Sequence, residues 1–111
     1  MEIREIVRTL EVVANRYGLN IIFIDFTDVT LVSRIGFLQN VFIQIYVNVK
    51  KDKVNMALIV VGNRIYGVDK EGGAYHEHPF EDPLQHIDTD KMDIEDFIIK
   101  SLEILKKIKL I

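Results

Sequence analysis

Apolar residues recur at helical spacing at both ends of the chain and alternate with polar residues between them. The N-terminal apolar stripe repeats every three or four positions and predicts a helix over residues 2–17. Gly18 follows at the place where a left-handed helix cap is expected. A second stripe predicts a helix over residues 93–107, with Asp93 as its N-cap. The two ends of the chain are therefore expected to be helical.

The segment between these helices predicts short strands joined by turns. Every second residue of 41–49 is a branched aliphatic residue, so these side chains point to one face. A lysine-rich turn connects this segment to an apolar run over residues 54–61, which predicts an antiparallel hairpin. Residues 20–26 are apolar at consecutive positions, which is typical of an interior strand or of an interface. Three further strands are predicted over residues 30–35, 64–69 and 74–78.

This order of elements predicts a single α+β domain over residues 1–111. Its core is an antiparallel β-meander of about five to six strands, with the N-terminal and the C-terminal helix packed on it. The helices can cover only one face of the sheet. The opposite face would carry Phe42 and Tyr46 and be only partly polar, so we expect a homodimer.

Composition narrows the classes of function. The 111 residues include no cysteine, which excludes disulfides and thiolate metal sites. A net charge of −3 argues against a broad basic surface for nucleic acid. The first residues lack the apolar segment of a signal peptide, and the apolar runs are too short to cross a bilayer. A cytoplasmic protein without a membrane partner is therefore expected.

All three histidines fall within residues 76–86. His76 and His78 are two positions apart on a predicted strand, so their rings should leave the same face of the sheet. His86 follows after a loop that contains Pro79 and Pro83. Chemistry at these residues would require a bend after Pro79 that returns this third ring to the other two, so that the three share one pocket with an acidic neighbour.

Such a cluster suits general acid–base catalysis on a phosphodiester. One histidine would deprotonate a ribose 2′-hydroxyl and another would protonate the leaving oxygen, since the unperturbed pKa of histidine, about 6.5, lies near working pH. Arg64 could stabilise the phosphate charge. A bulge at Gly67 would aim Asp69 at the histidine strand, where its carboxylate could orient a ring.

Two other interpretations fit the same residues. His76 and His78 could ligate a divalent metal such as zinc, with His86 or a carboxylate completing the set, and this metal would then be the only cofactor. Alternatively, the histidines could form only the polar end of a strand and a surface loop. If the histidines have no chemical role, the chain would be a non-catalytic dimeric module that binds a protein partner through its apolar surface.

From Arg64 onward the chain resembles the TumE-like family of small prokaryotic toxins. The resemblance lies in a strand with spaced Arg, Tyr and Asp, a glycine turn, a histidine-rich stretch with proline, and a short C-terminal helix. It implies a toxin that pairs with an antitoxin protein and acts on RNA, with Arg64 and Tyr66 in contact with phosphate or base. The residues that carry it are Arg64, Tyr66, Asp69, His76, His78, Pro79, His86 and the helix start at Met92–Phe97.

Overall fold

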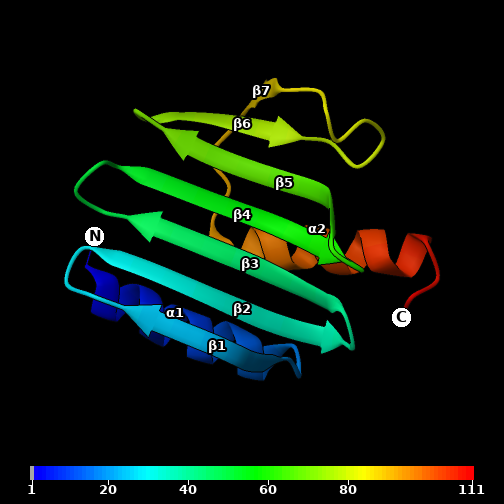
Figure 1. The fold of residues 1–111 in the computed structure, drawn as a ribbon, viewed down its shortest axis with the longest axis horizontal. Coiled ribbons are helices and arrows are strands. Elements are labelled where there is room, and N and C mark those ends of the chain that lie inside the picture. Colours follow the sequence, from blue (N-terminus) through cyan, green and yellow to red (C-terminus); the bar gives the residue numbers. More distant parts are fainter. Residues whose placement is uncertain (1) are drawn as a thin grey trace.

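The computed structural model describes residues 2–111 and has the predicted α+β architecture. One helix precedes and one follows a run of strands that pair in chain order, every neighbouring pair being antiparallel. The elements are α1 (Ile3–Arg16), β1 (Asn20–Phe26), β2 (Thr30–Leu38), β3 (Val41–Asn48), β4 (Lys53–Val60), β5 (Asn63–Glu71), β6 (Ala74–His78), β7 (Ile87–Thr89) and α2 (Ile94–Lys107). The seven strands form one open sheet (Figure 1).

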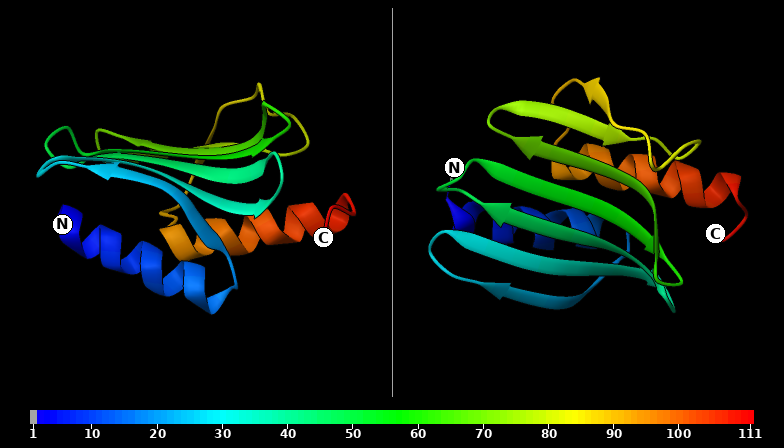
Figure 2. Two further views of the ribbon diagram at one scale, coloured as in Figure 1. Left: turned by 60° about the horizontal axis from the view of Figure 1, so that its bottom comes forward. Right: turned by 45° about the horizontal axis from the view of Figure 1, so that its top comes forward.

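Both helices lie against one face of the sheet and leave the other face uncovered (Figure 2). Strand β3 follows the predicted alternation, with Val41, Ile43, Ile45 and Val47 buried beneath the helices. The helices contribute buried side chains from one stripe each, among them Leu10 of α1. Burial of this apolar surface provides the main stabilisation of the domain. We call the uncovered side of the sheet the open face.

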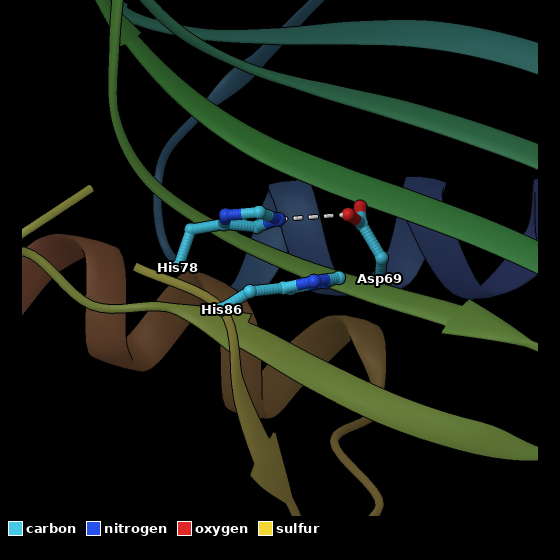
Figure 3. Close-up of side chains that lie close together, drawn as sticks. All are labelled: Asp69, His78 and His86. Atoms are coloured by element: carbon cyan, nitrogen blue, oxygen red, sulfur yellow. Dashed lines mark hydrogen bonds and ion pairs between the residues drawn. The ribbon is translucent and has the colours of Figure 1, made fainter. Parts of the chain in front are cut away.

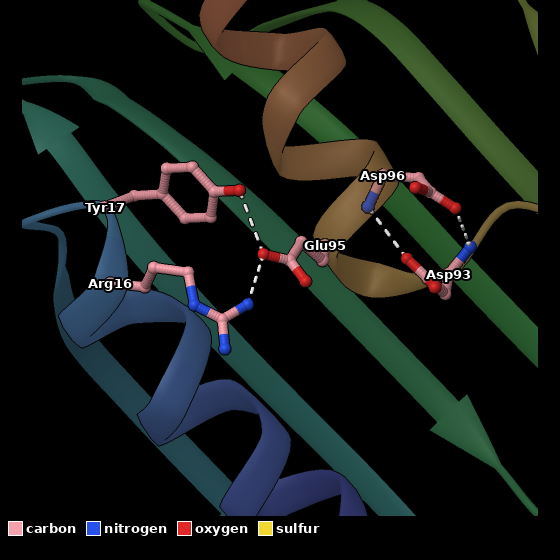
Figure 4. A network of polar contacts seen from close by, with 5 residues as sticks. All are labelled: Arg16, Tyr17, Asp93, Glu95 and Asp96. Atoms are coloured by element: carbon pink, nitrogen blue, oxygen red, sulfur yellow. Dashed lines mark hydrogen bonds and ion pairs between the residues drawn. The ribbon is translucent and has the colours of Figure 1, made fainter.

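The two helices are also joined by polar contacts (Figure 4). Glu95 in the first turn of α2 accepts hydrogen bonds from Arg16 and, at 2.9 Å, from the Tyr17 hydroxyl at the end of α1. The predicted N-cap is confirmed, because Asp93 accepts from the backbone N–H of Asp96 and Asp96 accepts from that of Asp93. Within residues 2–111, no helix is long and apolar enough to span a membrane.

Two expectations about the strands need correction. The sheet has one strand more than the upper predicted number, because Ile87–Thr89 pairs with β6 over a length too short to show an alternating pattern. The apolar strand β1 is not interior but lies at an edge of the sheet. Ile22 and Phe23 are 58% and 47% exposed there. The consecutive apolar residues of β1 therefore belong to an exposed edge strand and not to a strand buried on both faces.

Candidate histidine site

The pairing of β5 with β6 places the histidines beside the predicted aspartate. His76 lies opposite Asp69, and His78 lies opposite Gly67. Directly paired residues point to the same face of an antiparallel sheet. His76, His78 and Asp69 therefore all extend from the open face, on the side away from the helices. The strand alternation predicted from the sequence is confirmed here.

A bulge in β5 brings an arginine to the same face. Residues 64 and 69 are five positions apart and would point to opposite faces of a regular strand. The register shifts between Leu58 and Ile59 of β4, so that Ile65 is the extra residue on β5. The bulge was expected at Gly67 and lies instead at Ile65. Its consequence is that Arg64 joins Asp69 on the open face.

Both ring nitrogens of His78 have a polar neighbour, and Figure 3 shows the one on the Asp69 side. Its Nε2 lies 3.0 Å from Oδ2 of Asp69, and its Nδ1 lies 3.5 Å from an Arg64 terminal nitrogen. An ionised carboxylate can only accept, so Nε2 carries the proton and Nδ1 presents its lone pair. Asn55 of β4, oriented with its amide nitrogen towards the carboxylate, donates to Oδ1 of Asp69 at 3.0 Å. The tautomer of His78 is thus fixed by a chain of contacts.

The loop between β6 and β7 returns the third histidine to the other two. Its ring centroid lies 4.6 Å from that of His78, nearly parallel, and 4.5 Å from that of His76. Phe80 packs against the hydrophobic core and holds the start of this loop. A turn completes the bend, in which the backbone N–H of Asp82 donates to the carbonyl oxygen of Pro79. The three imidazoles converge, which is the condition that the proposed chemistry required, and His86 is outermost and exposed.

His76 also has an acidic partner. Nε2 of His76 lies 3.3 Å from Oδ1 of Asp88 on β7, a fully exposed carboxylate. Each of the two strand histidines therefore faces a different aspartate, whereas His86 contacts the other rings. The sequence did not single out two residues that contact this cluster. Nothing in the sequence pointed to Asn55, and Asp88 was one of several carboxylates near the histidines. Both contacts depend on which strands pair.

Gly67 allows the site to be compact. A β-carbon at this position would lie 3.3 Å from Cδ of Arg64 and 3.7 Å from the His78 ring, and 3.3 Å from the Met56 carbonyl oxygen. The first and last of these contacts are tighter than side chains normally accept. With no side chain here, Arg64 and His78 can close over the strand. The glycine thus serves a close approach rather than the bulge predicted for it.

The structure does not bring Tyr66 to the cluster. This side chain is 1% exposed, points towards the helices and stacks on Phe97. Its hydroxyl donates to Glu77 at 2.7 Å beside a cavity of about 220 Å³ between α2 and the loop after β6. Burial, and then the hydrogen bond to Glu77, raise the pKa of Tyr66 far above its usual value. A substrate at the histidines could not reach it.

Three ligand atoms of the cluster are close enough to hold a metal ion. One atom each from Asp69, His78 and His86 lies within 4.8 Å of the other two. Imidazole and carboxylate are the ligand types that zinc accepts. His76, which belonged to the predicted ligand set, is not in this group, and Asp69 takes its place. The donor set therefore fits a divalent ion, although in a different combination from the one expected.

Comparison with family models, with curated proteins and with solved structures finds no match for this chain. The resemblance to TumE-like toxins receives no support from these comparisons. Any function must therefore be argued from the site itself.

Proposed function

We propose that this chain is a small toxin-like enzyme that cleaves RNA by acid–base catalysis at His76, His78 and His86. The observation that supports this most directly is the convergence of three imidazoles around an Asp69–His78 contact. Metal-free RNA cleavage requires one group to accept a proton and another to donate one, and two histidines within reach of one phosphodiester can fill both roles.

In the proposed reaction His78 is the base and His86 the acid. Nδ1 of His78 takes the proton of a ribose 2′-hydroxyl, and the 2′-oxygen forms a bond to the adjacent phosphorus. The bond from phosphorus to the 5′-oxygen breaks, and His86 donates a proton to this leaving oxygen. The products are a 2′,3′-cyclic phosphate and a 5′-hydroxyl, so the step needs no co-reactant.

The charges around the rings support these roles. Asp69 holds the Nε2 proton of His78 and would stabilise the imidazolium that forms when Nδ1 accepts a second proton. Arg64 lies on the same side of that ring and can bind a phosphate oxygen. His76, placed against His86 and Asp88, is the candidate to return protons between turnovers. Tyr66 has no part in this scheme.

Expression in a bacterial host tests the toxin proposal. Wild-type chain is expected to slow growth, and His78→Ala or His76→Ala to relieve the effect while the purified variants stay folded by circular dichroism. Gln85→Ala, an exposed neighbour of His86 in the same loop, is the matched control and should remain toxic. Equal toxicity of wild type and folded histidine variants would remove the proposal. If the chain is toxic, we also propose that it pairs with an antitoxin protein.

Metal binding is the second candidate, favoured by the three close ligand atoms of Asp69, His78 and His86. Protein purified without a histidine tag would be titrated with zinc and analysed for bound metal. One ion per chain in wild type, lost in Asp69→Asn and kept in His76→Ala, would support this site. A stoichiometry well below one per chain would exclude it.

A homodimer remains a separate proposal. The edge strand β1 has an unpaired side and exposes Ile22, Phe23 and Phe26. Exposed apolar edge strands tend to pair with a second chain. Sedimentation velocity at micromolar concentration tests it, and a monomer there would contradict it.

A further inference from the structure

The strand registers align one row of residues straight across the open face. Each member is the direct partner of the next on the neighbouring strand, from the edge strand β1 to the histidine strand β6 (Figure 1). Residues paired in this way extend from the same face. The row consists of Phe23, Arg34, Gln44, Ala57, Gly67 and His78.

The end of the row remote from the histidines is an aromatic and cationic surface. The Arg34 guanidinium lies 5.3 Å from the ring centroid of Phe42 and 6.0 Å from that of Phe23. Its Nε donates to Gln44 at 3.2 Å, which fixes the plane of the group. Phe23 is 47% exposed, so one ring and the guanidinium present flat surfaces to solvent. Unpaired nucleic-acid bases stack on such surfaces.

Two arginines of the open face, Arg34 and Arg64, form no ion pair within the described part of the chain. Among the described residues, the ion pairs of arginine and lysine are Arg16 with Glu95 and Lys70 with Asp52. Arg34 and Arg64, both exposed, have no carboxylate partner in residues 2–111. Arg34 is itself in the row, and Arg64 contacts His78 at its far end. An external polyanion that crosses the strands would meet one cation near each end.

We propose that the open face binds single-stranded RNA across the strands, with a base stacked at Phe23 and Arg34 and the scissile phosphate at Arg64 and His78. This inference rests on the proposed function, since it specifies the substrate as unpaired RNA and its path to the histidines. Five strand spacings separate the row's ends, about 24 Å, which suits the shorter of the roughly 4–16-nucleotide sites of single-strand-binding folds. A duplex would hide the bases that this surface stacks.

The net charge of −3 is compatible with such a local site. Stacking contributes to binding independently of salt, whereas phosphate contacts weaken as salt rises. With only two arginines on the path, the salt dependence of binding should be shallow. A protein that bound RNA through a general basic field would instead lose affinity steeply.

Fluorescence anisotropy with a labelled 12-nucleotide single-stranded RNA tests the proposal. His86→Ala is used as the background, so that RNA is not cleaved during the measurement. In that background Phe23→Ala and Arg34→Gln are each expected to weaken binding about tenfold or more. Arg8→Gln, which removes an exposed arginine from α1 on the covered side, is the matched control and should bind as the parent does. A duplex of the same sequence should bind more weakly.

The outcomes separate this inference from the proposed function. Affinity that is unchanged by Phe23→Ala and Arg34→Gln, or lowered equally by Arg8→Gln, overturns the binding path even if histidine-dependent cleavage is found. Position-specific binding without any cleavage by wild type supports the path and contradicts catalysis. If Phe23→Ala instead converts a dimer to a monomer and RNA does not bind, the open face is a contact between chains and the inference fails.

Discussion

Nε2 of His78 and Oδ2 of Asp69 lie 3.0 Å apart across two neighbouring strands. The aspartate is in turn held by Asn55, and the opposite ring nitrogen of His78 faces Arg64. This arrangement fixes which nitrogen carries the proton, and the other nitrogen becomes the base once Arg64, which faces it, turns to a phosphate oxygen. It is the relationship on which the proposed chemistry depends, because a hydrogen bond at one ring nitrogen sets which nitrogen carries the proton.

Asp69→Asn should lower RNA cleavage by about 100-fold or more while the domain stays folded. The amide keeps the shape of the carboxylate but cannot stabilise the imidazolium of His78 during proton transfer. Turnover of a labelled RNA measures the effect, and thermal unfolding checks the fold. Asp28→Asn, an exposed aspartate in the turn after β1, is the control and should leave turnover unchanged. Cleavage by Asp69→Asn at the wild-type rate would contradict the role given to this pair.

Tyr66→Phe should destabilise the domain without changing cleavage. The substitution removes a buried hydroxyl that donates to Glu77 at 2.7 Å, and it leaves the stacking on Phe97 in place. Loss of such a bond lowers the free energy of unfolding by about 1–3 kcal/mol. Tyr75→Phe is the control, since its hydroxyl has no hydrogen bond within residues 2–111. Urea unfolding and turnover distinguish the two effects, and lost activity in a stable variant would return Tyr66 to the site.

Ser101→Ala should raise the free energy of unfolding by about 1 kcal/mol. The Ser101 hydroxyl is fully buried in α2 and has no hydrogen-bond partner among the described residues. Its removal relieves a desolvated polar group, and alanine favours the helix. The equally buried Ser33 donates to the Phe23 carbonyl at 3.0 Å, so Ser33→Ala should be destabilising instead. Urea unfolding measures the free energy of unfolding of both variants. A change in the same direction for both would contradict this account.

Glu95→Gln should weaken the junction of α1 and α2 in a pH-dependent manner. Hydrogen bonds from Arg16 and Tyr17 lower the pKa of Glu95 below its usual value. A carboxyl with a lowered folded-state pKa stabilises the protein above its unfolded pKa, about 4.3, and loses this contribution as pH falls through the folded value. Wild type should therefore be more stable than Glu95→Gln at pH 7, and the difference should shrink below about pH 4.

The control for this comparison is Glu103→Gln, which removes an exposed glutamate from the same helix. Its stability relative to wild type should change little between the two pH values. Urea midpoints at pH 7 and pH 3 provide the measurement. A difference between wild type and Glu95→Gln that persisted at pH 3 would show that packing, rather than charge, accounts for the effect.

Local patterns predicted most of the fold. Helical stripes and the Asp93 cap are determined within a few residues of sequence, and strand alternation placed His76 and His78 on one face. The edge position of β1 and the short β7 depend on which segments pair. Pairing is a long-range property, and the residues of β1 and β7 do not by themselves indicate which strands they pair with.

The sequence predicted only part of the candidate site, because the rest also depends on strand pairing. Arg64 and Tyr66 are two positions apart and were expected to act together, but the bulge at Ile65 turns them to opposite faces. A single extra residue reverses the alternation on one side of it. The row that links Phe23 to His78 could not be foreseen either, because it requires the registers of five strand pairs.

The most direct test of the central claim is the product of RNA cleavage by purified, tag-free protein in the presence of EDTA. The account predicts that wild type converts single-stranded RNA to fragments ending in a 2′,3′-cyclic phosphate, and that a 2′-deoxy substitution at the cleaved nucleotide abolishes the reaction. His78→Ala and His86→Ala should be inactive, and Gln85→Ala active. Folded wild type that leaves the RNA intact, or histidine variants that cleave it equally, would contradict the claim.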